Sequence, residues 1–199
     1  VGPRSRRWHG CTRCDGLRGL AQRRHHYVVI VIGGGISGMA AAASLASSGP
    51  VTVLDRGRRL GGRMAARTLR TGPWSGHIVD LGAAYLTVRR PEFARVVDGW
   101  QERGLLRPWT DTLAVADSQG LTGTTTGPMR FVARDGLRSL VEDLAAHLPA
   151  HVQVLSGTAA VGVFPRDHGW RVLRGRVDSS HATVSQARAV AMCLPGPQA

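Results

Sequence analysis

The chain contains no lysine: its 26 basic residues are all arginine, against 13 acidic residues, which gives a formal net charge of +13. Because alanine, glycine and arginine are abundant, we attribute the missing lysine to a GC-rich coding sequence rather than to a binding surface. Hydrophobic residues make up 43% of the chain and charged residues 20%, which excludes a disordered protein. A length of 199 residues suffices for about one well-buried domain.

Cysteine is also scarce. Three cysteines cannot build a disulfide framework in a chain of this size, so we expect a reducing compartment and a cytoplasmic protein. Cys11 and Cys14 form a CxxC near His25 and His26, but these histidines are adjacent and no second CxxC exists. A structural zinc ion needs four ligands at workable spacing, so we expect no metal site.

Acidic residues are almost absent from the start of the chain, where residues 1–27 contain seven arginines and one aspartate. A basic block of this kind can bind nucleic acid or another anionic surface. No aromatic-lined groove or helix-turn-helix pattern accompanies the charge. We therefore expect residues 1–26 to be a disordered leader or a stretch foreign to the natural protein, with nucleic-acid binding as a distant alternative.

No long hydrophobic run is free of glycine. By hydropathy alone, the uncharged residues 28–46 resemble a secretory signal or a short membrane span. This stretch begins with β-branched residues, breaks at three consecutive glycines and resumes as an alanine-rich helical pattern. These features favour a strand, a loop and a helix of a cytoplasmic protein that does not bind a membrane. Export is the minor alternative.

The glycines in this stretch form the GxGxxG pattern of dinucleotide-binding proteins. Residues 28–32 are predicted to form a strand that is buried on both faces. Gly33 permits the tight turn from strand to helix, Gly35 lets backbone amides approach a pyrophosphate, and Gly38 lets the helix pack closely on the strand. The positive end of a helix over residues 36–48 would then face the phosphates.

A second strand and an acidic residue complete this fingerprint. Residues 51–54 follow a helix stop at Gly49 and Pro50, and Asp55 lies 20 positions after Gly35. A carboxylate at this place accepts hydrogen bonds from the ribose hydroxyls of the adenosine. Strand, loop, helix, strand and carboxylate in this order predict an α/β fold: a Rossmann-type domain with a parallel sheet.

The next residues favour FAD. Residues 56–64 read Arg-Gly-Arg-Arg-Leu-Gly-Gly-Arg-Met and resemble the extended motif of the flavin amine-oxidase superfamily, in which Gly-Gly-Arg follows the second strand. Gly61 and Gly62 would let the backbone pass near the flavin diphosphate, which Arg63 would neutralise.

An NADP site is the alternative for the same stretch. Arg58 or Arg59 would then bind the 2′-phosphate. Asp55 would repel that phosphate, which makes FAD the better choice.

A second segment extends the resemblance. Residues 80–87, Asp-Leu-Gly-Ala-Ala-Tyr-Leu-Thr, are similar to the Asp-His-Gly-Ala-Gln-Tyr-Phe-Thr segment of bacterial renalase-like proteins, where the chain passes close to the flavin. Leu81 and Ala84 replace polar residues of that pattern, which puts catalytic contacts from these positions in doubt. By the same resemblance, a strand over residues 159–164 meets the adenine through the backbone at Val161.

The resemblance also implies the domain organisation. Residues 27–72 and 150–199 are expected to form the FAD-binding Rossmann-type domain, with a last strand near residues 189–195 that rejoins the sheet. Residues 73–149 would begin an α+β substrate domain that is incomplete in this chain. Helices are expected from Pro91 and between Met129 and Leu148, and their apolar positions are assigned to the core.

In function, the resemblance implies an FAD-dependent oxidoreductase that transfers a hydride from a reduced small-molecule substrate, an amine or a dihydronicotinamide, to flavin. The lysine that several amine oxidases place near the flavin cannot occur here, which favours the renalase-like branch. We predict no catalytic acid or base. The expected cofactor-binding residues are Gly33, Gly35, Ile36, Ser37, Gly38, Asp55, Arg56, Gly61, Gly62, Arg63 and Val161. The alternative is a non-catalytic fragment that binds the nucleotide without turnover.

Overall fold

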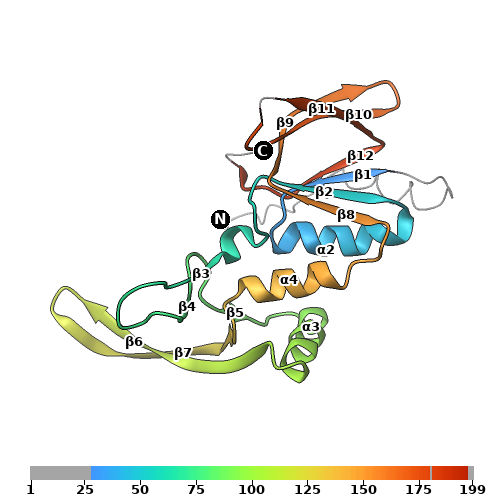
Figure 1. The fold of residues 1–199 in the computed structure, drawn as a ribbon. Coiled ribbons are helices and arrows are strands. Elements are labelled where there is room, and N and C mark those ends of the chain that lie inside the picture. Colours follow the sequence, from blue (N-terminus) through green and yellow to red (C-terminus); the bar gives the residue numbers. More distant parts are fainter. Residues whose placement is uncertain (1–27, 180, 197–199) are drawn as a thin grey trace, which may run out of the picture.

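The structure, a computed structural model, describes residues 28–179 and 181–196 (Figure 1). The basic leader with its CxxC, for which we predicted disorder and no zinc, lies outside these residues. Among the helices within the described ranges, none is long and apolar enough to cross a membrane.

A parallel four-stranded sheet forms the centre of the protein, in the order β12-β1-β2-β8. Its strands are β1 (Val29–Ile32), β2 (Val51–Asp55), β8 (Val152–Ser156) and β12 (Ala189–Met192). Every residue of β1 is buried, as expected for an apolar strand that is covered on both faces. The predicted Rossmann-type parallel sheet is confirmed, including the return of the chain to the sheet at β12.

Helices cover one face of this sheet (Figure 1). They are α2 (Ile36–Leu45), its 3-10 extension η1 (Ala46–Ser48) and α4 (Arg138–Ala146). The fully buried side chains of this core include Val31, Met39, Ala42, Val53 and Val141. Val141 comes from the segment that we assigned to the substrate domain, so α4 packs with the nucleotide-binding sheet. The predicted division into domains stays a prediction.

Three antiparallel strands cover the other face (Figure 1). They are β9 (Thr158–Arg166), β10 (Gly169–Arg176) and β11 (Ala182–Ala187), in the order β11-β10-β9. The buried side chains of this second core are Ile30, Ile32, Leu54, Val172 and Ala187. A strand within β9 was predicted. Strand β11 was not, because its Ala-Thr-Val-Ser-Gln-Ala sequence is mostly exposed and lacks an apolar pattern.

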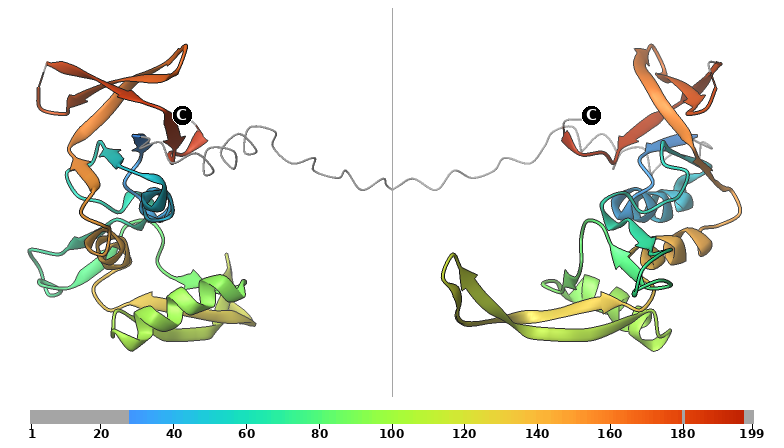
Figure 2. Two further views of the ribbon diagram at one scale, coloured as in Figure 1. Left: turned by 90° about the vertical axis from the view of Figure 1, so that its right-hand side faces the viewer. Right: turned by 60° about the vertical axis from the view of Figure 1, so that its left-hand side comes forward.

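Between β2 and α4 the chain forms two smaller sheets, one α-helix and one short 3-10 helix. These elements are η2 (Gly62–Met64), β3 (Ala66–Thr68), β4 (Ile78–Asp80), β5 (Leu86–Thr87), α3 (Pro91–Glu102), β6 (Leu106–Asp117) and β7 (Gly120–Ala133). Helix α3 begins at Pro91, as predicted. Strands β6 and β7 form a long antiparallel hairpin that extends away from the sheet, which the sequence analysis did not predict (Figure 2).

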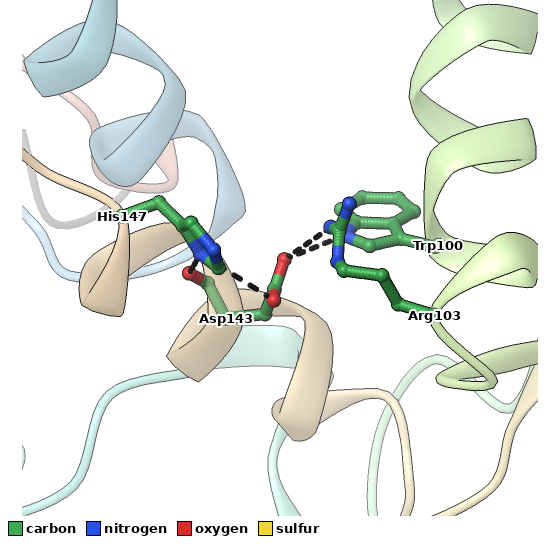
Figure 3. A network of polar contacts seen from close by, with 4 residues as sticks. All are labelled: Trp100, Arg103, Asp143 and His147. Carbon is green, nitrogen blue, oxygen red and sulfur yellow. Dashed lines mark hydrogen bonds and ion pairs between the residues drawn. The ribbon is translucent and has the colours of Figure 1, made fainter.

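The carboxylate of Asp143 joins α3 to α4 (Figure 3). Its Oδ2 accepts hydrogen bonds from Nε1 of Trp100 at 3.0 Å and from the guanidinium of Arg103 at 2.9 Å. The imidazole of His147, the residue that directly follows α4, lies 3.5 Å from Oδ1. Because the Asp143 side chain is only 12% exposed and the indole of Trp100 is buried, this network anchors the inserted segment to the helix layer of the sheet.

Candidate functional site

A cavity of about 500 Å³ opens at the carboxyl edge of the parallel sheet. It lies at the end of the central strand β1, which has β2 on one side and β12 on the other. The chain continues from β1 to β2 on one side and later returns as β12 on the other side, so the strand order switches direction here. In open parallel sheets this switch point is the usual place of ligand binding. Its lining residues are Ile32, Gly33, Gly35, Ile36, Ser37, Leu54, Asp55, Arg56, Gly57, Arg59, Gly61, Gly62, Arg63, Met64, Ala65, Arg138, Ala159, Ala160, Cys193, Leu194 and Pro195.

Two glycines of the loop are required by the packing of the protein itself. Gly33 has a φ of +114°, and a Cβ at this position would lie 2.5 Å from the carbonyl oxygen of Cys193. A Cβ on Gly38 would lie 1.7 Å from the carbonyl oxygen of Gly33, because α2 crosses close to the end of β1. Gly38 does not line the cavity, in keeping with the helix-packing role predicted for it.

Gly35 differs from these two glycines. A Cβ built on it would approach nothing closer than 3.8 Å, and its φ of −84° is open to any residue. The protein therefore has no packing reason for glycine at this position. Gly35 also lines the cavity, so the loop fits a ligand that approaches the backbone at the start of α2.

The Gly61–Gly62 turn closes the cavity against this loop. The amide of Gly61 donates to the carbonyl oxygen of Gly34 at 3.0 Å, and Gly35 and Gly61 form an isolated parallel bridge. Gly61 and Gly62 both have positive φ, +128° and +55°, which favours glycine. The carbonyl oxygen of Arg63 in turn accepts a hydrogen bond from the amide of Ala83 at 2.9 Å. The predicted renalase-like segment thus runs directly behind the Gly-Gly-Arg turn.

Asp55 lies at the end of β2, at the rim of the cavity. Its carboxylate accepts hydrogen bonds from the amide of Gly34 and from the amide of Gly57, the latter at 2.5 Å. These contacts hold the side chain beside the glycine loop. Each carboxylate oxygen can accept a further hydrogen bond, so Asp55 keeps the capacity to bind ribose hydroxyls.

The cavity is strongly basic, because four arginines and one aspartate are among its lining residues. The arginines are Arg56, Arg59, Arg63 and Arg138. Arg59 also forms an exposed ion pair with Glu142 of α4 at 2.8 Å. A diphosphate, which carries about two negative charges and many acceptor oxygens, suits this lining.

Arg138 is a member of this set that the sequence analysis missed. It is the first residue of α4, and no motif marks it. Its Nε is buried and has no hydrogen-bond partner within residues 28–179 and 181–196. The sequence held only one pointer, the Gly136-Leu137 turn before the helix, which we assigned to packing.

The turn before Arg138 is held by Asp80. Oδ1 of Asp80 accepts a hydrogen bond from the amide of Leu137 at 2.8 Å. Burial raises the pKa of the Asp80 carboxyl, and the hydrogen bond from Leu137 lowers it by less. Gly136 has a φ of +75°, and a Cβ there would lie 2.7 Å from Ala66. Asp80 and Gly136 together set where α4 begins.

The predicted contact between the Val161 backbone and the adenine stays a prediction. Val161 is 61% exposed and does not line the cavity, whereas Ala159 and Ala160 do. Side chains alternate along β9, so Ala160 packs on the second core and Val161 points outwards. The half-buried Cys193 also lines the cavity, and burial raises the pKa of its thiol.

A larger hollow, of about 830 Å³, lies at the opposite edge of the sheet, where Val28 precedes β1 and Arg188 precedes β12. Its lining includes Trp170, His168 and Arg166, and none of the glycine-loop residues. We therefore place the candidate site in the smaller cavity. In the described part of the chain no cluster of His, Cys, Asp and Glu side chains could hold a metal ion.

Comparisons with known proteins agree with this geometry. A family model described as an NAD(P)-binding Rossmann-like domain matches residues 31–100. The chain has a Rossmann-like, dinucleotide-binding fold. Two crystal structures of oxidoreductase-type proteins share it, at sequence identities that establish the fold alone.

The first is from Exiguobacterium sp. 255-15 and is provisionally described as a protoporphyrinogen oxidase; it has a TM-score of 0.65 and 16% identity, over 88% of this chain and 61% of its own. The second is p-nitrophenol 4-monooxygenase PnpA from Pseudomonas putida DLL-E4, with a TM-score of 0.54 and 18% identity, over 84% of this chain and 40% of its own. The chain therefore spans 61% and 40% of these two neighbours. Neither comparison tests the narrower resemblance to renalase-like proteins.

Proposed function

We propose that this chain carries the FAD site of a flavin-dependent oxidoreductase. One observation carries the proposal: Gly35 has space for a side chain within the protein, yet faces a cavity that is lined by four arginines. A ligand that needs both bare backbone and positive charge is a dinucleotide diphosphate. The Rossmann-like match and the two structural neighbours are consistent with FAD.

Each end of the proposed cofactor has its own residues. Asp55 would accept hydrogen bonds from the adenosine ribose, because it lies at the end of the second strand. Arg63 and the Gly61–Gly62 turn would hold the diphosphate against the amides of Ile36 and Ser37 at the start of α2. Ala159 and Ala160 line the cavity where the sequence analysis expected the adenine to meet Val161.

NADP is the less favoured occupant of this cavity. The 2′-phosphate of NADP would have to lie close to Asp55, whose carboxylate is fixed by two backbone amides. Repulsion between two anions at this distance disfavours the phosphate. A free ribose hydroxyl, as in FAD, would instead donate to the same carboxylate.

Bound FAD would supply the redox chemistry, by accepting a hydride from a reduced substrate. The chain itself would bind and orient the cofactor. We propose an amine or a dihydronicotinamide as substrate, on the resemblance of residues 56–64 to flavin amine oxidases and of residues 80–87 to renalase-like proteins. The few cysteines support a cytoplasmic location.

An anaerobic reduction experiment tests this function. The chain is loaded with FAD, freed of excess cofactor and mixed without oxygen with NADH, with NADPH or with a primary amine. Loss of the visible flavin absorption with one of these, and its return on admission of air, is the expected result. Retained flavin that no substrate reduces would favour the non-catalytic nucleotide-binding alternative. Salt-sensitive DNA binding that is lost on removal of residues 1–26 would favour the nucleic-acid reading.

A further inference from the structure

Arg138 reaches the cavity from a part of the chain that the dinucleotide fingerprint does not include. It is the first residue of α4, 75 positions after Arg63, and its side chain packs over the Gly-Gly turn. A Cβ built on Gly61 would lie 3.3 Å from Cγ and 3.5 Å from Nε of Arg138. Gly61 in turn is bonded to the carbonyl oxygen of Gly34. The guanidinium group is therefore held where the two glycine segments meet.

The Nε of Arg138 is buried but has no hydrogen-bond partner among the described residues. Such a donor is costly to leave unpaired, so it calls for an acceptor. Two acidic side chains near Arg138 already have partners. Glu142 is paired with Arg59, and Asp80 accepts from the amide of Leu137.

The fold fixes Arg138 before any ligand arrives. Leu137 and Leu140, on either side of it, are 1% and 0% exposed and belong to one core cluster. Asp80 and the left-handed Gly136 determine the turn from which the helix begins. A guanidinium that is held in this way loses little conformational entropy on binding, which favours affinity.

We propose that Arg138 is a further diphosphate-binding residue, which acts together with Arg63 on the cofactor bound over the two glycine segments. This inference rests on the proposed FAD site and adds to it a ligand from α4. Because Arg138 lines the cavity, a bound diphosphate would gain a charge-assisted contact with its guanidinium group. It would also connect the cofactor to α4, and through Asp143 to α3.

Equilibrium titration of flavin fluorescence, with FAD, tests the inference without any measurement of turnover. We expect Arg138→Gln to raise the Kd for FAD by about 10- to 100-fold. The affinity for ADP, measured by competition with FAD, should fall by a similar factor. Adenosine, which has no phosphate, should bind the variant as it binds the wild type. The matched control is Arg130→Gln, because Arg130 also has a buried Nε without a partner in the described chain but lies outside the cavity.

The outcomes separate this inference from the function on which it rests. An unchanged Kd for FAD in a folded Arg138→Gln variant overturns the role of Arg138 and leaves the FAD site standing. If the wild type itself binds no FAD, both proposals fail. Should Arg138→Gln not fold, Arg138→Lys decides: it keeps the charge but loses the planar fork, and we expect a Kd raised by roughly threefold to tenfold. An unchanged Kd in that variant also overturns the inference.

Discussion

Replacement of Gly35 by alanine should weaken FAD binding strongly while leaving the fold stable. The new Cβ would meet no protein atom within 3.8 Å, and the backbone at Gly35 is extended. Loss of glycine at a helix N-cap costs less than about 1 kcal/mol, partly offset by the lower entropy of the unfolded chain. Inside the cavity, however, the methyl group would take space along the diphosphate. Overpacking of this kind costs roughly 1.4–2.8 kcal/mol, which is about 10- to 100-fold in Kd.

Gly38→Ala should have the opposite pattern, with a strong effect on the stability of the fold. Its Cβ would lie 1.7 Å from the carbonyl oxygen of Gly33, a backbone atom that cannot move aside cheaply. Helix α2 would have to shift away from β1, at a cost of about 3 kcal/mol or more. Urea unfolding without cofactor should therefore show a lower midpoint for Gly38→Ala and a nearly unchanged one for Gly35→Ala. Wild-type FAD affinity in Gly35→Ala would refute the placement of the diphosphate against this residue.

Two further changes probe the supports of the site. Asp80→Ala removes the acceptor for the amide of Leu137 and should lower the free energy of unfolding by about 1–2 kcal/mol at neutral pH, measured by urea titration. Because burial raises the folded-state pKa of Asp80 above its ordinary 3.8, wild-type stability should fall relative to Asp80→Asn as pH rises from about 4 through the raised value. A constant difference across that range would contradict this. Asp143→Ala leaves the buried indole of Trp100 unpaired and should lower the free energy of unfolding by about 1–3 kcal/mol, measured by urea titration. The control Asp98→Ala, on the exposed side of α3, should leave this free energy unchanged.

The first βαβ unit could be predicted from the sequence because its signals are local. The apolar run at residues 28–32, the glycines that follow and Asp55 each specify their own backbone or burial, and the structure agrees. The β6–β7 hairpin carries no such signal. Most of its side chains are exposed, and several glycines and threonines hide the alternation that marks a half-buried strand.

The site was predictable only as far as its parts are adjacent in sequence. Arg138 comes to Gly61 through the packing of α4 on the helix layer, and no pattern within one sequence encodes that meeting. Val161 was assigned by resemblance to a backbone contact with the adenine, and this stays a prediction. Its side chain is exposed, whereas Ala160 lies on the inner face of the strand. A shift of one residue along a strand reverses the face, which is why position in a motif alone is a weak guide there.

The most direct test of the FAD site is the visible spectrum of the wild-type chain after incubation with FAD, alone and with excess NADP, and removal of free ligand. We expect close to one equivalent of retained flavin, unaffected by NADP and lost in Asp55→Ala. A protein that is folded but colourless, or flavin that NADP displaces, would contradict it.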